Sequence, residues 1–138
     1  MTSEHELPKG WLEGTLIDIA DPNPDKGSAV KKLQRFRYVD ISCLSPNGLV
    51  ATQDIEFVAR EDAPSRAQRL LHTGDVLVGT VRPERRARGR VTEDLNGQVA
   101  STGICVLRPK STSDSAFIHA VVRGNSFTEW CVGRETGT

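Results

Sequence analysis

Residues 75–90 join an apolar segment to a dense run of arginines, and this junction constrains the chain more than any other stretch. Residues 75–81 are rich in β-branched and aliphatic side chains without helical spacing, which predicts a strand that Pro83 ends. Residues 82–90 then carry five arginines against one acid, Glu84, a local charge of +4 in a chain of zero formal net charge. The positive charge is therefore concentrated at the end of one strand, where a loop could hold phosphates.

The size and composition of the chain suit one folded unit. We expect residues 1–138 to form a single domain in which residues 1–6 are disordered, because 138 residues with 37% hydrophobic content can bury a core without disulfides. The chain has no long apolar run and a polar, acidic N-terminus, so we expect a cytoplasmic protein without a membrane partner. Zero net charge requires any contact with nucleic acid to be a local patch.

Period-two alternation and turn residues indicate further strands. Residues 36–44 alternate and predict a strand, which the turn Ser45-Pro46-Asn47-Gly48 would join to a short strand at residues 49–51. Asn96-Gly97 predicts a hairpin turn that leads into a strand at residues 99–107. Gly103 inside that strand indicates a bulge or a close approach by another group.

Helices are expected at three places. Pro64 and the spacing of Ala67 and Leu70 predict a short helix within residues 59–71, which Gly74 would end. Two more are expected near the C-terminus, one capped by Ser113 or Asp114 and one starting at the capping-box spacing of residues 126–129. We therefore predict an α+β fold with a twisted, mostly antiparallel sheet, a few short helices and two C-terminal helices.

No motif for catalysis or metal binding is recognisable. The histidines and cysteines lack ligand spacing, and neither a nucleophile elbow nor a Gly-rich phosphate loop occurs. We expect a non-catalytic protein without a metal site or cofactor, with mostly buried, free thiols. The residues concerned are His5, His72, His119, Cys43, Cys105 and Cys131.

The arginines are the candidate binding residues. Guanidinium groups suit bidentate contact with phosphate or with the edge of guanine, although any single arginine is more often a solvated surface residue. Aromatic residues make up only 5% of the chain, which gives RNA binding less support. The candidates are Arg82, Arg85, Arg86, Arg88 and Arg90, with Arg66 and Arg69 before them.

Several motifs together resemble a known family. LPKGW (residues 7–11), FRYVDIS (36–42), APSRAQRLLHTGDVLVGTVRP (63–83), STGICVLRPK (101–110) and SFTEWCVGRETGT (126–138) occur in the order found in target-recognition domains of type I restriction-modification specificity (S) subunits. The resemblance implies a mixed α/β domain that reads one half of a bipartite double-stranded DNA target in the major groove. It covers one such domain, which ends where the family continues into a spacer helix.

The resemblance also implies roles and partners. Arg82, in the TVRP motif, is the first candidate for a DNA contact. Ser101, Thr102 and Gly103 match a second motif, which would either contact the DNA backbone or hold the sheet, and the structural role is slightly favoured. Methylation and cleavage would belong to methyltransferase (M) and restriction (R) subunits, which use S-adenosylmethionine, ATP and magnesium. The alternative is an interaction or regulatory fragment that binds a methyltransferase subunit without reading DNA. The expected core residues are Trp11, Val76, Leu77, Val106 and Leu107.

Overall fold

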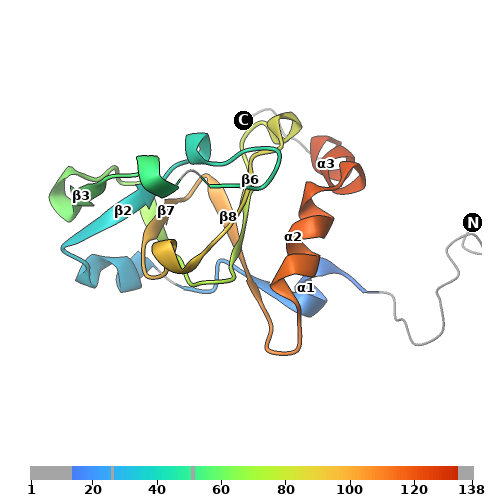
Figure 1. Ribbon diagram of the computed structural model, residues 1–138, viewed down its shortest axis with the longest axis horizontal. Coiled ribbons are helices and arrows are strands. Elements are labelled where there is room, and N and C mark those ends of the chain that lie inside the picture. Colours follow the sequence, from blue (N-terminus) through green and yellow to red (C-terminus); the bar gives the residue numbers. More distant parts are fainter. Residues whose placement is uncertain (1–13, 26, 51, 134–138) are drawn as a thin grey trace, which may run out of the picture.

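The strands of the described residues form two four-stranded sheets, shown in Figure 1. The computed structural model describes residues 14–25, 27–50 and 52–133, so the expectations for residues 1–6 and Trp11 lie outside the described residues. The first sheet has the order β1-β8-β5-β6, with every neighbouring pair antiparallel. Its strands are β1 (Ala20–Pro22), β8 (Ile104–Pro109), β5 (Val76–Gly79) and β6 (Arg88–Arg90).

The second sheet has the order β3-β2-β7-β4 and contains one parallel pair, β2 with β7. Its strands are β3 (Phe57–Ala59), β2 (Arg35–Val39), β7 (Val99–Ser101) and β4 (Ala67–Leu70). The segment expected as one strand at residues 99–107 is divided between β7 and β8, because the chain turns at Thr102-Gly103 and passes from one sheet into the other. The expected α+β class is confirmed, with two sheets in place of one.

Three α-helices in the described part of the chain complete the fold. They are α1 (Leu16–Ile19), α2 (Ser115–Arg123) and α3 (Asn125–Val132). Both C-terminal helices are confirmed, and the Asp114 side chain caps α2 by accepting a hydrogen bond from the Ala116 N–H at 2.9 Å. The second starts after Gly124, so Ser126 lies inside α3 and does not cap it. No helix within the described ranges is long and apolar enough to cross a membrane.

The prediction of a helix within residues 59–71 is wrong. The chain there forms a 3-10 turn, η5 (Arg60–Asp62), and then the strand β4. Ala67 and Leu70 pack against the apolar cluster around Phe36, so tertiary packing overrides the local helical spacing. Gly74 has a positive φ of 93°, in a turn that follows a strand and not a helix.

The prediction of two hairpins is also wrong, although both turns form. Gly48 donates its N–H to the Ser45 carbonyl at 3.0 Å with a φ of 82°, but residues 48–50 do not continue as a strand. Asn96-Gly97 lies between β6 of the first sheet and β7 of the second. The chain changes sheets at that turn, so the turn cannot close a hairpin.

The interior consists of three apolar clusters separated by the two sheets. One lies between the sheets and contains Leu77 and Val106, and another lies between the first sheet and α2 and contains Val76 and Leu107. These four predicted core residues are confirmed, at no more than 7% exposure. The third cluster lies under the second sheet, where the 3-10 segment η2 (Gly27–Lys32) covers it.

A buried carboxylate fixes the loops before β5. Asp75 is fully buried and accepts hydrogen bonds at 2.9 Å from both Nε and Nη2 of Arg108, whose Nη1 donates to Asp25 at 2.8 Å. Hydrogen bonding to Asp75 raises the pKa of Arg108 above its ordinary value. The pair holds β8 to the start of β5, and so sets the position of the residues that follow β5.

Candidate nucleic-acid interface

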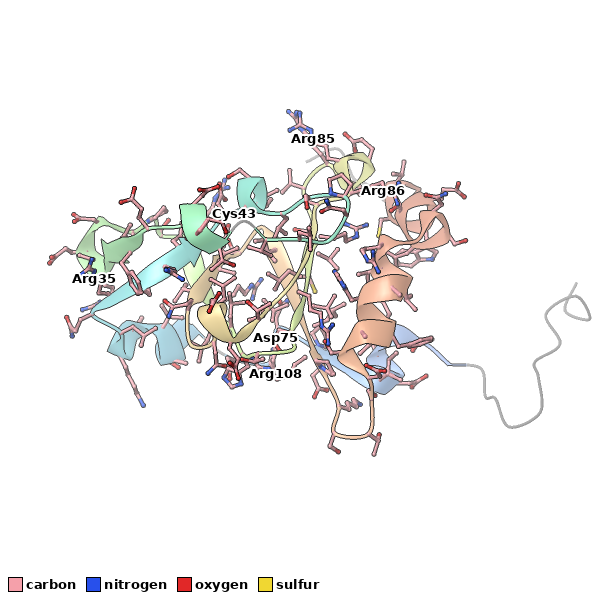
Figure 2. The ribbon with its side chains drawn as sticks, in the orientation of Figure 1. Arg35, Cys43, Asp75, Arg85, Arg86 and Arg108 are labelled. Atoms are coloured by element: carbon pink, nitrogen blue, oxygen red, sulfur yellow. The ribbon has the colours of Figure 1, made fainter. Side chains whose placement is uncertain are left out.

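The arginine-rich segment begins as a tight turn beyond β5. This turn, η6 (Pro83–Arg85), lies between Arg82 and Arg86, whose φ angles of 54° and 56° place both in the left-handed region. A non-glycine residue in that region costs on the order of 1 kcal/mol, so the surroundings must hold the turn in shape. Arg82 and Arg85 are exposed, and Figure 2 shows Arg85 extending away from the body of the protein.

The last three arginines of the run that lie at alternate positions, Arg86, Arg88 and Arg90, direct their side chains toward the C-terminal helices. The Arg86 Nη2 donates to the Arg123 carbonyl at 2.6 Å, and the Arg88 Nε donates to the Val122 carbonyl at 2.6 Å. At the other end of α2, the Arg90 Nε donates to the Ser115 hydroxyl at 2.8 Å. Residues two apart in an extended chain share a face, so one face of this segment runs along α2 from its last turn to its first residue.

Arg88 is the most buried of the candidates, with 1% of its surface exposed. Its Nη1 donates to the Ala87 carbonyl at 3.0 Å and its Nη2 to the Thr128 hydroxyl at 3.2 Å, while its guanidinium carbon lies 5.3 Å from the centre of the Phe127 ring. Burial lowers the pKa of Arg88. The group is compensated by carbonyls at the C-terminal end of α2, where the helix dipole favours a cation.

The prediction that Arg88 contacts DNA does not fit this position, because a duplex cannot reach a side chain enclosed by β6, α2 and α3. The spacing Arg86-x-Arg88-x-Arg90 contained the signal, since period-two alternation predicts that these side chains share one face of a strand. A helix against that face could not be inferred from the run itself. We assign Arg88 a positioning role.

The two earlier candidates lie on or beside the edge strand β4 of the second sheet. Arg66 is exposed in the turn before β4, and its carbonyl accepts the Thr102 N–H at 2.9 Å. Arg69 is half-buried within β4, and its Nε is enclosed without a hydrogen-bond partner in the described part of the chain.

The two short family-like motifs meet where the chain passes between the sheets. Thr80, of the TVRP motif, donates from its N–H and its hydroxyl to the Gly103 carbonyl at 2.9 and 3.0 Å. The buried Ser101 hydroxyl accepts the Gly103 N–H at 3.0 Å. A Cβ on Gly103 would lie 2.9 Å from Cδ1 of Ile41, so the close approach expected at this glycine is to a side chain. These contacts support the structural role expected for Ser101, Thr102 and Gly103.

A further basic group, which the sequence argument did not single out, lies on β2 and β3. The guanidinium carbons of Arg35 and Arg37 lie 5.3 and 5.0 Å from the centre of the Phe57 ring. The alternation Arg35-Phe36-Arg37 could have indicated it, because a buried Phe36 places both arginines on the other face of the strand. No group of three or more His, Cys, Asp or Glu side chains within the described ranges could hold a metal ion.

Comparison with known proteins gives matches among solved structures. No protein-family model matches the sequence, and neither does any curated protein. A structure that describes complex assembly and conformational transition of a type I R-M system matches 96% of this chain and 34% of its own, at 30% identity and a TM-score of 0.83. The HsdS subunit from Thermoanaerobacter tengcongensis matches 100% of this chain and 36% of its own, at 29% identity and a TM-score of 0.82. The chain therefore belongs with the type I restriction-modification specificity subunits and corresponds to a single target-recognition domain, about one third of their length.

Proposed function

We propose that the chain recognises one half of a bipartite double-stranded DNA sequence as part of a type I restriction-modification complex. The observation that carries the proposal is the exposed, preformed turn η6 on a fold that matches specificity subunits over nearly all of the chain. Methylation and cleavage are assigned to partner subunits, so the chain itself contributes binding and not catalysis. Such a module acts in defence against foreign DNA by directing those partners to a sequence.

Arg82 and Arg85 are the proposed primary contacts. Both are exposed, and the hydrogen bond from Arg86 to the last turn of α2 helps to hold η6 in shape before DNA arrives, which reduces the entropy lost on binding. Arginine can bind guanine O6 and N7 in a bidentate manner, a contact worth about 1–3 kcal/mol of discrimination against a wrong base. We assign base reading to Arg85 and a phosphate contact to Arg82, since Arg82 lies closer to the end of β5.

Arg90, Arg86 and Arg66 are proposed as secondary contacts. Arg90 is exposed and uses its Nε on Ser115, which leaves its terminal nitrogens for a phosphate. Arg86 uses Nη2 on the Arg123 carbonyl, so its main role is to hold η6 against α2. Arg66 is exposed but belongs to the other sheet, so it would touch the duplex away from the bases read by η6.

Selection of bound duplexes from a random library tests the proposal and identifies the target. We expect Arg85→Ala to relax the preference at one base pair, and Arg82→Ala to weaken all duplexes and reduce the salt dependence of binding by about one counterion. Lys110→Ala is the matched control, because it removes one charge from an exposed residue beyond β8. Absence of binding to any duplex at low salt would contradict the proposal.

A second function, binding of a methyltransferase subunit, is favoured by one feature of α2. Phe117 and Val121, one helical turn apart, are 52% and 36% exposed on the face away from the first sheet. Exposed apolar residues in a row are typical of protein contacts. Loss of co-purification with a type I methyltransferase subunit on Phe117→Ser, with duplex binding retained, would support this function, and unchanged co-purification would oppose it.

A further inference from the structure

Two arginines on β2 form cation–π contacts with one aromatic ring of β3. β2 and β3 are antiparallel with Arg37 opposite Phe57, and both guanidinium groups lie over that ring. Phe57 is 44% exposed, so the three side chains form a surface feature and not part of the core. We call Arg35, Arg37 and Phe57 the β2–β3 cluster.

The charge of the cluster is not compensated within the part of the chain that the structure describes. Neither Arg35 nor Arg37 forms an ion pair there, and the Nε of Arg37 is enclosed without a hydrogen-bond partner. Arg108 differs, because its guanidinium group is bonded to two carboxylates. Two adjacent cations without an anion repel each other, so a bound anion would relieve the repulsion.

A third guanidinium group extends the same face of the second sheet. Val39 and Arg69 are both opposite Ala100 of β7, and Val39 lies two residues after Arg37 on β2. Arg69 therefore shares the face of the β2–β3 cluster, and its Nε also lacks a partner in the described ranges. The opposite face is different, since it carries Phe36 and is covered by η2.

We infer that the β2–β3 cluster binds the phosphate backbone of the same duplex, away from the bases that η6 reads. This inference rests on the proposed function. Figure 2 shows Arg35 near the left end of the molecule and Arg85 at its upper edge near the middle, so the two contacts would lie apart along an extended ligand. Stacking on Phe57 fixes both guanidinium groups in advance, which favours multidentate contact with phosphate over a loose attraction.

An acidic protein segment is the less favoured ligand. A peptide that adds to the edge strand β3 would need pockets for alternate side chains. Two cavities of the described residues that lie near this sheet and its neighbouring loops are lined by other residues, among them Arg60 and Gln68 in one and Leu49 and Gln53 in the other. A phosphate backbone needs only placed cations, which the β2–β3 cluster supplies.

The test is the salt dependence of binding of the double variant Arg35→Ala/Arg37→Ala to a selected duplex and to an unrelated one. Loss of two phosphate contacts should reduce the slope of log K against log salt by about 1.8, equally for both duplexes, and leave the preference between them unchanged. Lys31→Ala/Lys32→Ala is the matched control for the loss of two positive charges: both lysines are exposed and lie on η2, which covers the opposite face of the sheet. We expect that control to keep the wild-type slope.

The outcomes separate the two proposals. Wild-type binding with equal slopes for the two double variants would overturn the inference and leave the proposed function standing, whereas no wild-type binding to duplex would overturn both. A reduced preference between duplexes, or loss of methyltransferase co-purification with an unchanged slope, would also overturn the inference. If the alanine variant melts at a lower temperature, Arg35→Gln/Arg37→Gln keeps most of each side chain and should give the same reduction in slope.

Discussion

Removing the Arg88 side chain should destabilise the contact between the arginine-rich segment and the C-terminal helices without changing Arg82 or Arg85, the proposed DNA contacts. In Arg88→Ala the Val122 carbonyl and the Thr128 hydroxyl lose a charged donor while they remain buried. Each such unsatisfied group costs about 1–3 kcal/mol, and the emptied volume adds to the cost. Relief of the desolvated charge offsets part of this, so we expect the free energy of unfolding to fall by about 3 kcal/mol.

Urea unfolding followed by circular dichroism measures that change, and for a domain of this size it corresponds to a decrease of about 10 °C in Tm. Arg88→Met separates packing from hydrogen bonding, because it fills much of the same volume without a donor, and it should lose about 2 kcal/mol. Arg85→Ala is the control, since Arg85 is exposed on η6 and its loss should leave Tm unchanged.

Duplex binding should depend on Arg85 and not on Arg88, which is the reverse of the effect expected on stability. Below its melting temperature, Arg88→Met should bind a selected duplex with the wild-type salt slope, whereas Arg85→Ala should lose affinity or base preference. The reasoning would be refuted if Arg88→Ala kept the wild-type stability, or if Arg88→Met reduced the salt slope as an exposed phosphate contact does.

Three further predictions concern stability. Burial and the nearby Arg123 lower the pKa of His119, so the folded state binds fewer protons than the unfolded state near pH 6. The free energy of unfolding should therefore decrease as the pH falls below about 6.5. In urea titrations between pH 7.5 and 5.5, His119→Gln should flatten that decrease. Asp75→Asn leaves the Arg108 guanidinium group short of its buried anion and should cost about 3 kcal/mol in the same assay, with an unchanged value opposing a structural role for the pair. Gly79→Ala places a Cβ 2.8 Å from the Cβ of Ala87, between β5 and the arginine-rich segment, and should lower the free energy of unfolding by about 1–3 kcal/mol. In Gly97→Ala, by contrast, the new Cβ meets no atom within 4 Å, so the variant should cost only the strain of its positive φ.

The parts of the fold that the sequence predicts well are those where local pattern and burial agree. β5 is apolar on both faces because it lies between two clusters, and a continuous apolar run of that length reads as a strand. α2 has both a cap at Asp114 and apolar residues at helical spacing, so two independent signals place it. Agreement between such signals is what allows an element to be predicted from one sequence.

The failures occur where a local pattern fits two structures. Ala67, Leu70 and Leu71 have helical spacing, but a strand with an irregular register also brings Ala67 and Leu70 into the cluster under the second sheet. Residues 99–107 divide between two sheets at a turn where Gly103 packs against Ile41, 62 residues earlier in the chain. Such long-range packing has no counterpart in local periodicity.

The candidate site was predictable as a segment and not as a set of contacts. Charge density selects residues 82–90 as the candidate segment, yet it cannot distinguish Arg85, which extends from the surface, from Arg88, which is buried. That distinction needs the position of α2, about thirty residues later in the chain. The β2–β3 cluster was overlooked because its two arginines do not stand out in number, and only the register with Phe57 brings them together.

The packing of Arg86, Arg88 and Arg90 against α2 has a consequence for changing what the domain recognises. A library that randomises residues 82–90 evenly would mostly yield clones that fail to fold, because residues 86, 88 and 90 support the helices. Diversity placed at residues 82, 84 and 85, with the alternate arginines retained, would keep the scaffold intact while the surface proposed to contact DNA varies. If the proposed function holds, retargeting of this domain requires sampling of only a few exposed positions on a fixed scaffold.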